Sequence, residues 1–194
     1  TFIFNMLILG LTGSTGVAAY GVVANLSLVG MAIMNGMAQG VQPLISESFG
    51  KGAFDDVKKL LHWGLTCVVA IEIIMVALVW SFTDPFISVF NSENNQLLLE
   101  YAHVGLRLYF LGFLFAGVNI VLVAYFSATA NARPAIIGSL LRGVVAIGIC
   151  AIVLSRIFGM NGVWLSFLTS EVITLIMVLI LARHKESRKT NAYV

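Results

Sequence analysis

Long apolar runs dominate this chain and predict helices that cross a membrane. No Asp, Glu, Lys or Arg occurs before Glu47. Three later stretches, 60–83, 108–132 and 157–182, contain at most one such residue each. A helix needs about 20 mostly apolar residues to span the hydrocarbon core of a bilayer. Strands of a membrane barrel would instead alternate polar and apolar residues over short segments, so we predict an all-α, polytopic membrane protein.

Glycine and proline residues at the ends of the apolar runs mark the connections between the expected helices. We predict a bundle of about six transmembrane helices at 1–12, 17–46, 60–82, 100–129, 134–156 and 162–183, with a tail at 184–194. The first run ends at Leu11, after about half a bilayer, so we expect the chain to begin inside a truncated span of a longer protein. An amphipathic stretch at 54–63 is expected to lie along the membrane surface before the third span.

Composition supports a lipid-exposed surface and excludes several functions. Of 194 residues, 59% are hydrophobic and 10% are charged, whereas soluble domains have about 25% charged residues. The net charge of +2 and the absence of a dense basic patch argue against nucleic-acid binding. Cys67 and Cys150 both lie in apolar runs, so we expect no disulfide framework and no metal site. No metalloprotease, P-loop or nucleophile-elbow motif occurs, so we expect no enzyme, no catalytic residues and no cofactor.

The distribution of Lys and Arg predicts the orientation of the bundle. Connections on one side, together with the tail, contain eight basic residues: Lys51, Lys58, Lys59, Arg133, Arg183, Lys185, Arg188 and Lys189. The opposite side contains only Arg156. Positive charge favours the cytoplasmic side, so we expect the tail in the cytoplasm and the loop at 83–99 outside the cell.

A polar stripe runs along the second predicted helix. Asn35, Gln39, Gln42 and Ser46 are spaced by three or four residues, which places them on one helical face. Such a stripe must face protein or water rather than lipid. It either lines a substrate path or forms hydrogen bonds between helices, and the sequence leaves both readings open.

Two carboxyl groups fall near the middle of predicted spans. Glu171 neighbours a hydroxyl stripe formed by Ser166, Ser170 and Thr174, and an ionised carboxylate there is costly. We therefore expect Glu171 to be a proton or cation site, against the alternative of a neutral carboxyl bonded within the bundle. Glu72 is equally deep but has only apolar neighbours on its own helical face, so it is the weaker candidate.

Three further polar residues lie within the predicted spans. Arg107 shares one face of the fourth helix with Glu100 and His103, and it either pairs with an acid or binds an anionic group. Asn119 lies in mid-span and is a candidate to coordinate substrate or a neighbouring helix. Arg142 is close enough to the cytoplasmic end that its side chain is expected to extend toward the lipid head groups.

Several short segments, in order along nearly the whole chain, carry a resemblance to a known family. They are 16–21 (GVAAYG), 35–46 (NGMAQGVQPLIS), 49–52 (FGKG), 109–113 (YFLGF) with Asn119, 125–126 (YF), 139–142 (SLLR), and 162–166 (GVWLS) with Glu171. Together they resemble the multidrug and toxic compound extrusion (MATE) family. The order of the segments places this chain as the C-terminal half, one of the two bundles of such a transporter.

The resemblance implies an antiporter in which two six-helix bundles face each other across a central cavity and alternate access. Entry of Na⁺ or H⁺ drives expulsion of cationic or amphipathic drugs, in the plasma membrane and for bacterial members in the inner membrane. The partners implied are small-molecule drugs, the lipid bilayer and an N-terminal six-helix half. Some relatives use a carboxylate in the seventh helix, which would precede Thr1, or an Asp in the tenth helix. This chain has no Asp after Asp84, so its cation site is expected elsewhere.

Two alternatives remain from the sequence. A lipid-linked oligosaccharide flippase of the same superfamily would need a cavity rich in Arg and Lys for pyrophosphate. A non-transporting membrane scaffold or partner subunit would instead seal its polar stripes between helices and contain no water-filled cavity.

The orientation is testable by labelling single cysteines after Cys67 and Cys150 have been replaced. A membrane-impermeant thiol reagent added outside intact cells should modify Ser92→Cys, whereas Ser187→Cys should react only after the membrane is opened. The opposite labelling pattern would refute the orientation.

Overall fold

The computed structural model describes residues 2–190, with side chains described up to residue 182. All of its regular secondary structure within these residues is helical. In chain order the elements are α1 (Phe2–Gly50), α2 (Phe54–Ser81), α3 (Thr83–Ser88), α4 (Gln96–Phe110), α5 (Phe113–Ala128), α6 (Ala132–Leu140), the π-helical segment η1 (Leu141–Val145) and α7 (Ala146–Thr190). Thr1, residues 191–194 and the side chains of the predicted tail lie outside the described residues.

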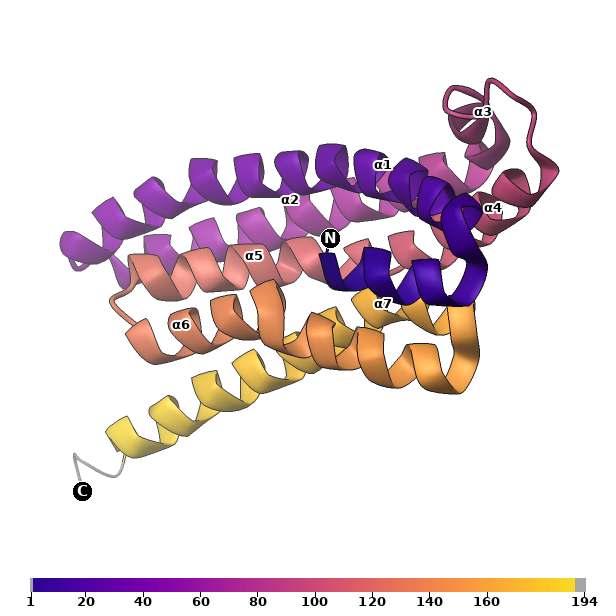
Figure 1. Cartoon of the computed structure of the whole chain (residues 1–194). Helices are drawn as coiled ribbons and strands as arrows, with labels where there is room; N and C mark the ends of the chain where they lie inside the picture. The colour runs from indigo at the N-terminus through magenta and orange to yellow at the C-terminus, as the bar shows by residue number, and fades with distance from the viewer. Residues whose placement is uncertain (1, 191–194) are drawn as a thin grey trace.

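Two glycines divide the longest helices into hairpins. Gly13 in α1 has φ +71° and ψ −160°, and Gly159 in α7 has φ +58° and ψ −132°. Residues with a Cβ atom adopt this conformation only under strain, so glycine is favoured at the point where α1 and α7 each reverse direction. Figure 1 shows the short first arm of α1 and the first arm of α7 folding back at the same end of the molecule.

The helices form six rods that run along a common direction. Three helical stretches, Phe2–Gly50, Phe54–Ser81 and Ala132–Ala182, are long and apolar enough to cross a membrane. The bent pair of α4 and α5, at 41°, makes a fourth candidate, and the glycine breaks divide two of the three long stretches into two arms each. The described residues therefore form an all-α bundle whose rods correspond in order to the six predicted helices.

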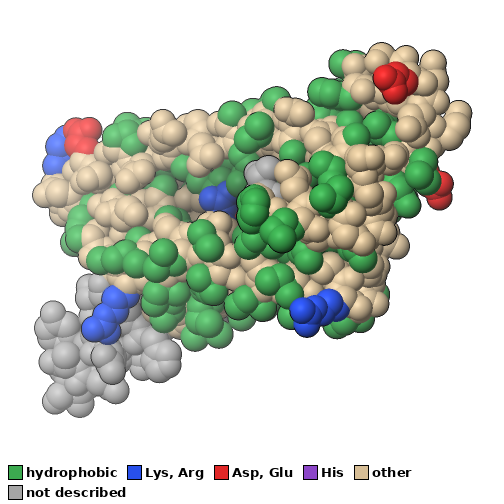
Figure 2. All heavy atoms as spheres, in the orientation of Figure 1, with side chains coloured by type: hydrophobic (Ala, Val, Ile, Leu, Met, Phe, Trp, Pro, Cys, Tyr) green, Lys and Arg blue, Asp and Glu red, His purple; other side chains and the backbone are tan. Residues whose placement is uncertain are grey.

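The connections gather at two opposite ends of the bundle. Figure 1 shows the α1–α2 and α5–α6 connections at the end where α7 ends, and α3 with the two glycine hairpins at the other. Hydrophobic side chains are spread over the face in Figure 2, while acidic side chains lie near its ends. Large exposed residues such as Ile73, Trp63 and Ile149 are typical of a surface solvated by lipid. This grouping of connections agrees with the predicted topology, and the cytoplasmic assignment stays a prediction.

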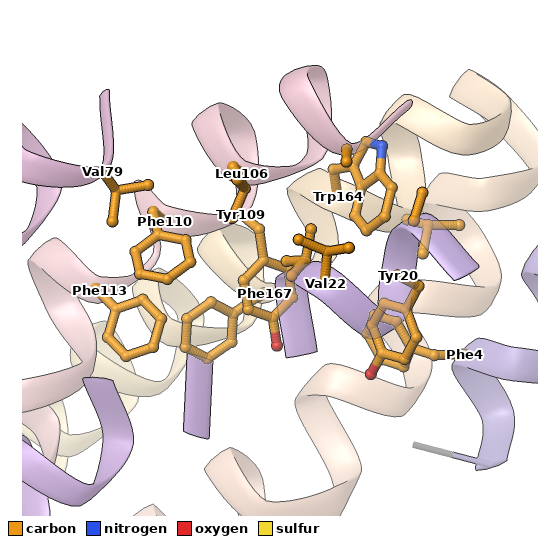
Figure 3. Packing of buried hydrophobic residues seen from close by; sticks show 14 of the residues in the cluster. Phe4, Tyr20, Val22, Val79, Leu106, Tyr109, Phe110, Phe113, Trp164 and Phe167 are labelled. Carbon is orange, nitrogen blue, oxygen red and sulfur yellow. The ribbon is translucent and has the colours of Figure 1, made fainter. Parts of the chain in front are cut away.

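An aromatic core joins α1, α4, α5 and α7. Tyr109 stacks on Phe167 with ring centroids 4.5 Å apart, and the pair lies at the centre of Figure 3. Glycines admit the large rings at the helix contacts. A Cβ at Gly105 would lie 2.9 Å from the buried Trp164 ring, and one at Gly112 would lie 2.4 Å from Phe167. Small residues thus let α4 and its junction with α5 approach α7 closely, as is common in membrane bundles.

The structure differs from the sequence-based expectation in two rods. The predicted surface helix at 54–63 is wrong, because α2 begins at Phe54 and runs without a break to Ser81. Its first turns are held in the bundle by Val57, which is buried in a cluster with Ile45 and Ala128. The predicted helix at 100–129 begins earlier, at Gln96, and is broken between Phe110 and Phe113, where the bend redirects α5.

The hairpin at Gly159 makes a test of the fold. Gly159→Ala should destabilise the protein by about 1–3 kcal/mol, since a Cβ strains this backbone conformation, and should lower the Tm in detergent by about 2–10 °C. Gly148→Ala is the matched control, because a Cβ there would only reach ordinary contact with Ile3 at 3.9 Å. An unchanged Tm for Gly159→Ala, or an equal loss in both variants, would contradict the assigned hairpin.

Candidate functional site

Glu171, in the second arm of α7, is held by side chains from two other elements. The amide nitrogen of Asn119 in α5 donates to Glu171 Oε2 at 2.7 Å and to the Glu171 carbonyl oxygen at 2.9 Å. Arg142, in η1, donates through Nε to Glu171 Oε1 at 3.1 Å. Both carboxylate oxygens are therefore hydrogen-bonded, which fixes the position of the carboxyl group.

Burial makes this ion pair dependent on its partners. The side chain of Glu171 is 2% exposed and that of Arg142 is 18% exposed. A lone charged side chain at the centre of a bilayer costs about 3 kcal/mol or more, and pairing with hydrogen bonds offsets that cost. The expectation that Arg142 extends to the lipid head groups is wrong, because its guanidinium turns inward to the carboxylate. Its place in a π-helical turn, which shifts the register of side chains along a helix, accompanies this orientation.

A cavity of about 500 Å³ opens beside the ion pair. Asn35, Gln39 and Gln42 of the predicted polar stripe line it from α1, facing Arg142 and Glu171. The other lining residues are Met31, Ala38, Tyr109, Ile120, Val123, Ala124, Ser127, Ser139, Gly143, Ile147 and Phe167. The cavity thus brings the polar stripe and the mid-membrane carboxyl group, which are far apart in sequence, into one site.

Pro43 leaves one backbone carbonyl oxygen of α1 without its usual helical hydrogen bond. Pro43 lies inside α1 and has no N–H, so it cannot donate the helical hydrogen bond to the carbonyl oxygen of Gln39. That carbonyl belongs to a residue that lines the cavity. Asn35, by contrast, donates its side-chain amide to the Met31 carbonyl oxygen at 2.8 Å, within its own helix.

The hydroxyl stripe beside Glu171 has a structural role. Ser166, Ser170 and Thr174 are buried, and their hydroxyls donate to carbonyl oxygens of α7 at 2.6–2.8 Å. None of these bonds reaches the Glu171 carboxyl group. The groups that bind this carboxyl come from other helices, and no spacing along α7 could have revealed them.

The remaining candidate residues lie outside the cavity. Glu72 is 1% exposed between α2 and α5, where its Oε1 accepts from the Gly117 N–H at 2.6 Å and its Oε2 has no partner among the described residues. Arg107 is exposed on the surface of the bundle. His103 lies 3.6 Å from Asp84 near the end of the molecule that carries α3. Asn119 is fully buried behind Glu171 and positions it.

A second cleft, of about 620 Å³, adjoins the first and is lined by no charged side chain. It shares Met31, Tyr109, Gly143 and Ile147 with the main cavity and continues past Leu28 toward Phe4 and Tyr20. Within the described residues no group of three or more His, Cys, Asp or Glu side chains is placed to hold a metal ion. The sites available to a small molecule are therefore a charged, amide-lined cavity and an aromatic cleft beside it.

A lipid-solvated bundle that encloses an ion pair beside a polar cavity defines a multi-pass membrane protein with a charged interior site. The MatE family model matches residues 1–152, and the chain belongs to this family of transporters, which are not enzymes. The multidrug export protein MepA of Staphylococcus aureus (strain bovine RF122 / ET3-1) is 28% identical over 161 residues, covering 82% of this chain and 34% of that protein. MepA of Staphylococcus saprophyticus is 26% identical over 190 residues, covering 97% and 41%.

Solved structures of MATE transporters have the same fold. The outward-facing conformation of a multidrug resistance MATE family transporter gives a TM-score of 0.87 at 17% identity, covering 98% of this chain and 43% of that one. The inward-facing conformation gives 0.88 at 17% identity, covering 100% and 44%. The chain thus spans less than half the length of these relatives.

The geometry of the cavity predicts which positions of α1 meet water. In the full-length transporter lacking Cys67 and Cys150, Gln39→Cys should react with a water-soluble thiol reagent, because Gln39 lines the cavity. A bound drug should slow that reaction. Ile33→Cys is the control, since Ile33 is exposed on the same helix but does not line the cavity. If Gln39→Cys is inert in every state, the stripe serves only in contacts between helices.

Proposed function

We propose that this chain is the C-terminal six-helix half of a secondary active multidrug efflux transporter. The whole transporter exchanges cationic or amphipathic compounds for Na⁺ or H⁺ by alternating access in the plasma membrane. The tail of this half lies in the cytoplasm. The observation that carries the proposal is the cavity in which Glu171, Arg142 and the amides of α1 face one another. The names of the similar export proteins and the order of the family segments support it.

Alternating access needs a half that moves as one body. The similarity to transporters in outward-facing and inward-facing conformations is equally high over almost the whole chain, with TM-scores of 0.87 and 0.88. An aromatic core that joins four of the helices supports a bundle that keeps its shape while it rotates. The cavity is then one wall of a path whose other wall comes from the N-terminal half.

The site combines the features needed to bind and release a cation. Glu171 supplies the negative charge, and Gln39 and Gln42 supply neutral acceptors that suit cations of different shape. The stacked rings of Tyr109 and Phe167 supply an apolar surface in the same cavity. This combination favours amphipathic cations, with a proton or Na⁺ reaching the same carboxylate when the drug is absent.

The alternatives fit the cavity less well. A flippase for pyrophosphate-linked lipids needs several unpaired basic residues, whereas Arg142 is the one Lys or Arg among the described residues that lines the cavity, and it is paired with Glu171. A scaffold protein would seal its polar stripe, whereas Gln39 is exposed beside the cavity in the described bundle.

The proposal is tested by drug efflux against an imposed pH or Na⁺ gradient in the full-length transporter. Glu171→Gln should lower gradient-driven efflux at least about tenfold, because the amide keeps the shape of the side chain but cannot exchange a cation. Glu72→Gln is a matched control, since Glu72 is equally buried but lies outside the cavity, and it should leave coupling unchanged. Normal coupling in Glu171→Gln, with unchanged expression and Tm, would remove Glu171 from the mechanism.

A further inference from the structure

Arg142 makes only part of the contacts that its guanidinium group can make. An arginine offers five N–H donors and pairs best with a carboxylate through two parallel hydrogen bonds. Here a single bond joins Arg142 Nε to Glu171 Oε1, and Nη2 lies 3.4 Å from the sulfur of Met31, which is a weak acceptor. The bond to Glu171 is therefore one that another cation can replace.

Glu171 keeps its position without Arg142. Asn119 is fully buried and holds both the carboxylate and the backbone carbonyl of Glu171 through its side-chain amide. The Oδ1 atom of Asn119 has no donor among the described residues. The carboxylate is thus fixed by α5, while Oε1 faces the side from which Arg142 approaches.

Arg142 lies on the more deformable part of its rod. The five residues of η1 form a π-helical turn, and none of them is buried. A π turn is a rare interruption of an α-helix and occurs often at functional sites. Gly143, the next residue, adds backbone freedom within the same turn and also lines the cavity. A small change in this turn can carry the guanidinium away from Glu171 into the open cavity.

We propose that Arg142 is a tethered cation that an organic cation entering the cavity displaces from Glu171. The inference rests on the proposed function and adds a specific exchange to it. The incoming cation takes the place of the guanidinium on Oε1, with its apolar rings against Tyr109 and Phe167, and Arg142 moves toward water in the cavity. When Arg142 returns to Glu171, it expels the cation, so the site never retains its substrate after the path has opened.

Few charged side chains line the cavity in which the exchange takes place. Arg142 and Glu171 are the only Lys, Arg, Asp or Glu side chains of the described residues that line the cavity. The balance between the tethered and the incoming cation is therefore set by this pair. Removing Arg142 should free the carboxylate for the substrate, and removing Glu171 should abolish the competition.

Ethidium binding to the purified full-length transporter, followed by fluorescence, tests the exchange. Arg142→Gln should bind ethidium about tenfold more tightly than the wild type, since it lacks the competing charge, and should release it more slowly during efflux. Arg142→Lys should lie between the two, because the ammonium keeps the charge and loses the planar guanidinium. Arg133→Gln is the matched control on the same rod, since Arg133 is exposed outside the cavity, and it should bind as the wild type does.

A second variant separates failure of the inference from failure of the proposed function. In the Glu171→Gln background, Arg142→Gln should tighten binding much less than it does alone, because no carboxylate is left to compete for and only the repulsion between the two cations is removed. If Arg142→Gln binds ethidium as weakly as the wild type does, or tightens binding equally in both backgrounds, the exchange is overturned. If instead the wild type binds no ethidium, or Glu171→Gln binds it as the wild type does, the proposed function itself fails. Should Arg142→Gln not fold, Arg142→Lys decides, and unchanged affinity in that variant overturns the exchange.

Discussion

A bilayer offers no hydrogen-bonding partner to a polar group in its interior, and this constraint organises the whole molecule. Nearly all backbone groups are paired within helices, and the described chain reverses at the two ends of the bundle, with Gly13 and Gly159 both at the end that carries α3. Charged side chains inside the bundle are tolerated only with partners. Glu171 has Asn119 and Arg142, and Glu72 has the N–H of Gly117.

Close packing of α4 and the α4–α5 junction against α7, at glycine residues, holds the polar site in place. Gly105 and Gly112 let α4 and the α4–α5 junction lie directly against Trp164 and Phe167 of α7. The same approach brings Asn119 of α5 within hydrogen-bonding distance of Glu171, one turn beyond Phe167 on α7. The aromatic core and the polar site are therefore parts of one helix interface, in which the apolar contacts hold the polar atoms at bonding distance.

The two members of the ion pair are held with unequal rigidity. The carboxylate belongs to the packed interface, whereas the guanidinium comes from a π-helical turn with no buried residue. The cavity lies on the side of the guanidinium, where amides of α1 and two stacked rings complete the lining. In the proposed exchange, a rigid anion beside a replaceable cation is the physical basis for selecting cations from a mixture of apolar compounds.

The sequence by itself determined the all-α membrane class, the order of the six rods, the family, and two of the main components of the site. The length of apolar runs and the spacing of Asn35, Gln39 and Gln42 are local properties, and lipid solvation translates them directly into helices and a polar face. Tertiary structure alone decided what those components meet. Glu171 and Glu72 are equally deep in their predicted spans, and the hydroxyl stripe that favoured Glu171 does not bind its carboxyl group, yet only Glu171 reaches the cavity. Arg142 reaches Glu171 from 29 residues away, because the π-helical turn and the helix packing set the rotation of each rod, and residue spacing along a single helix contains no information on that rotation.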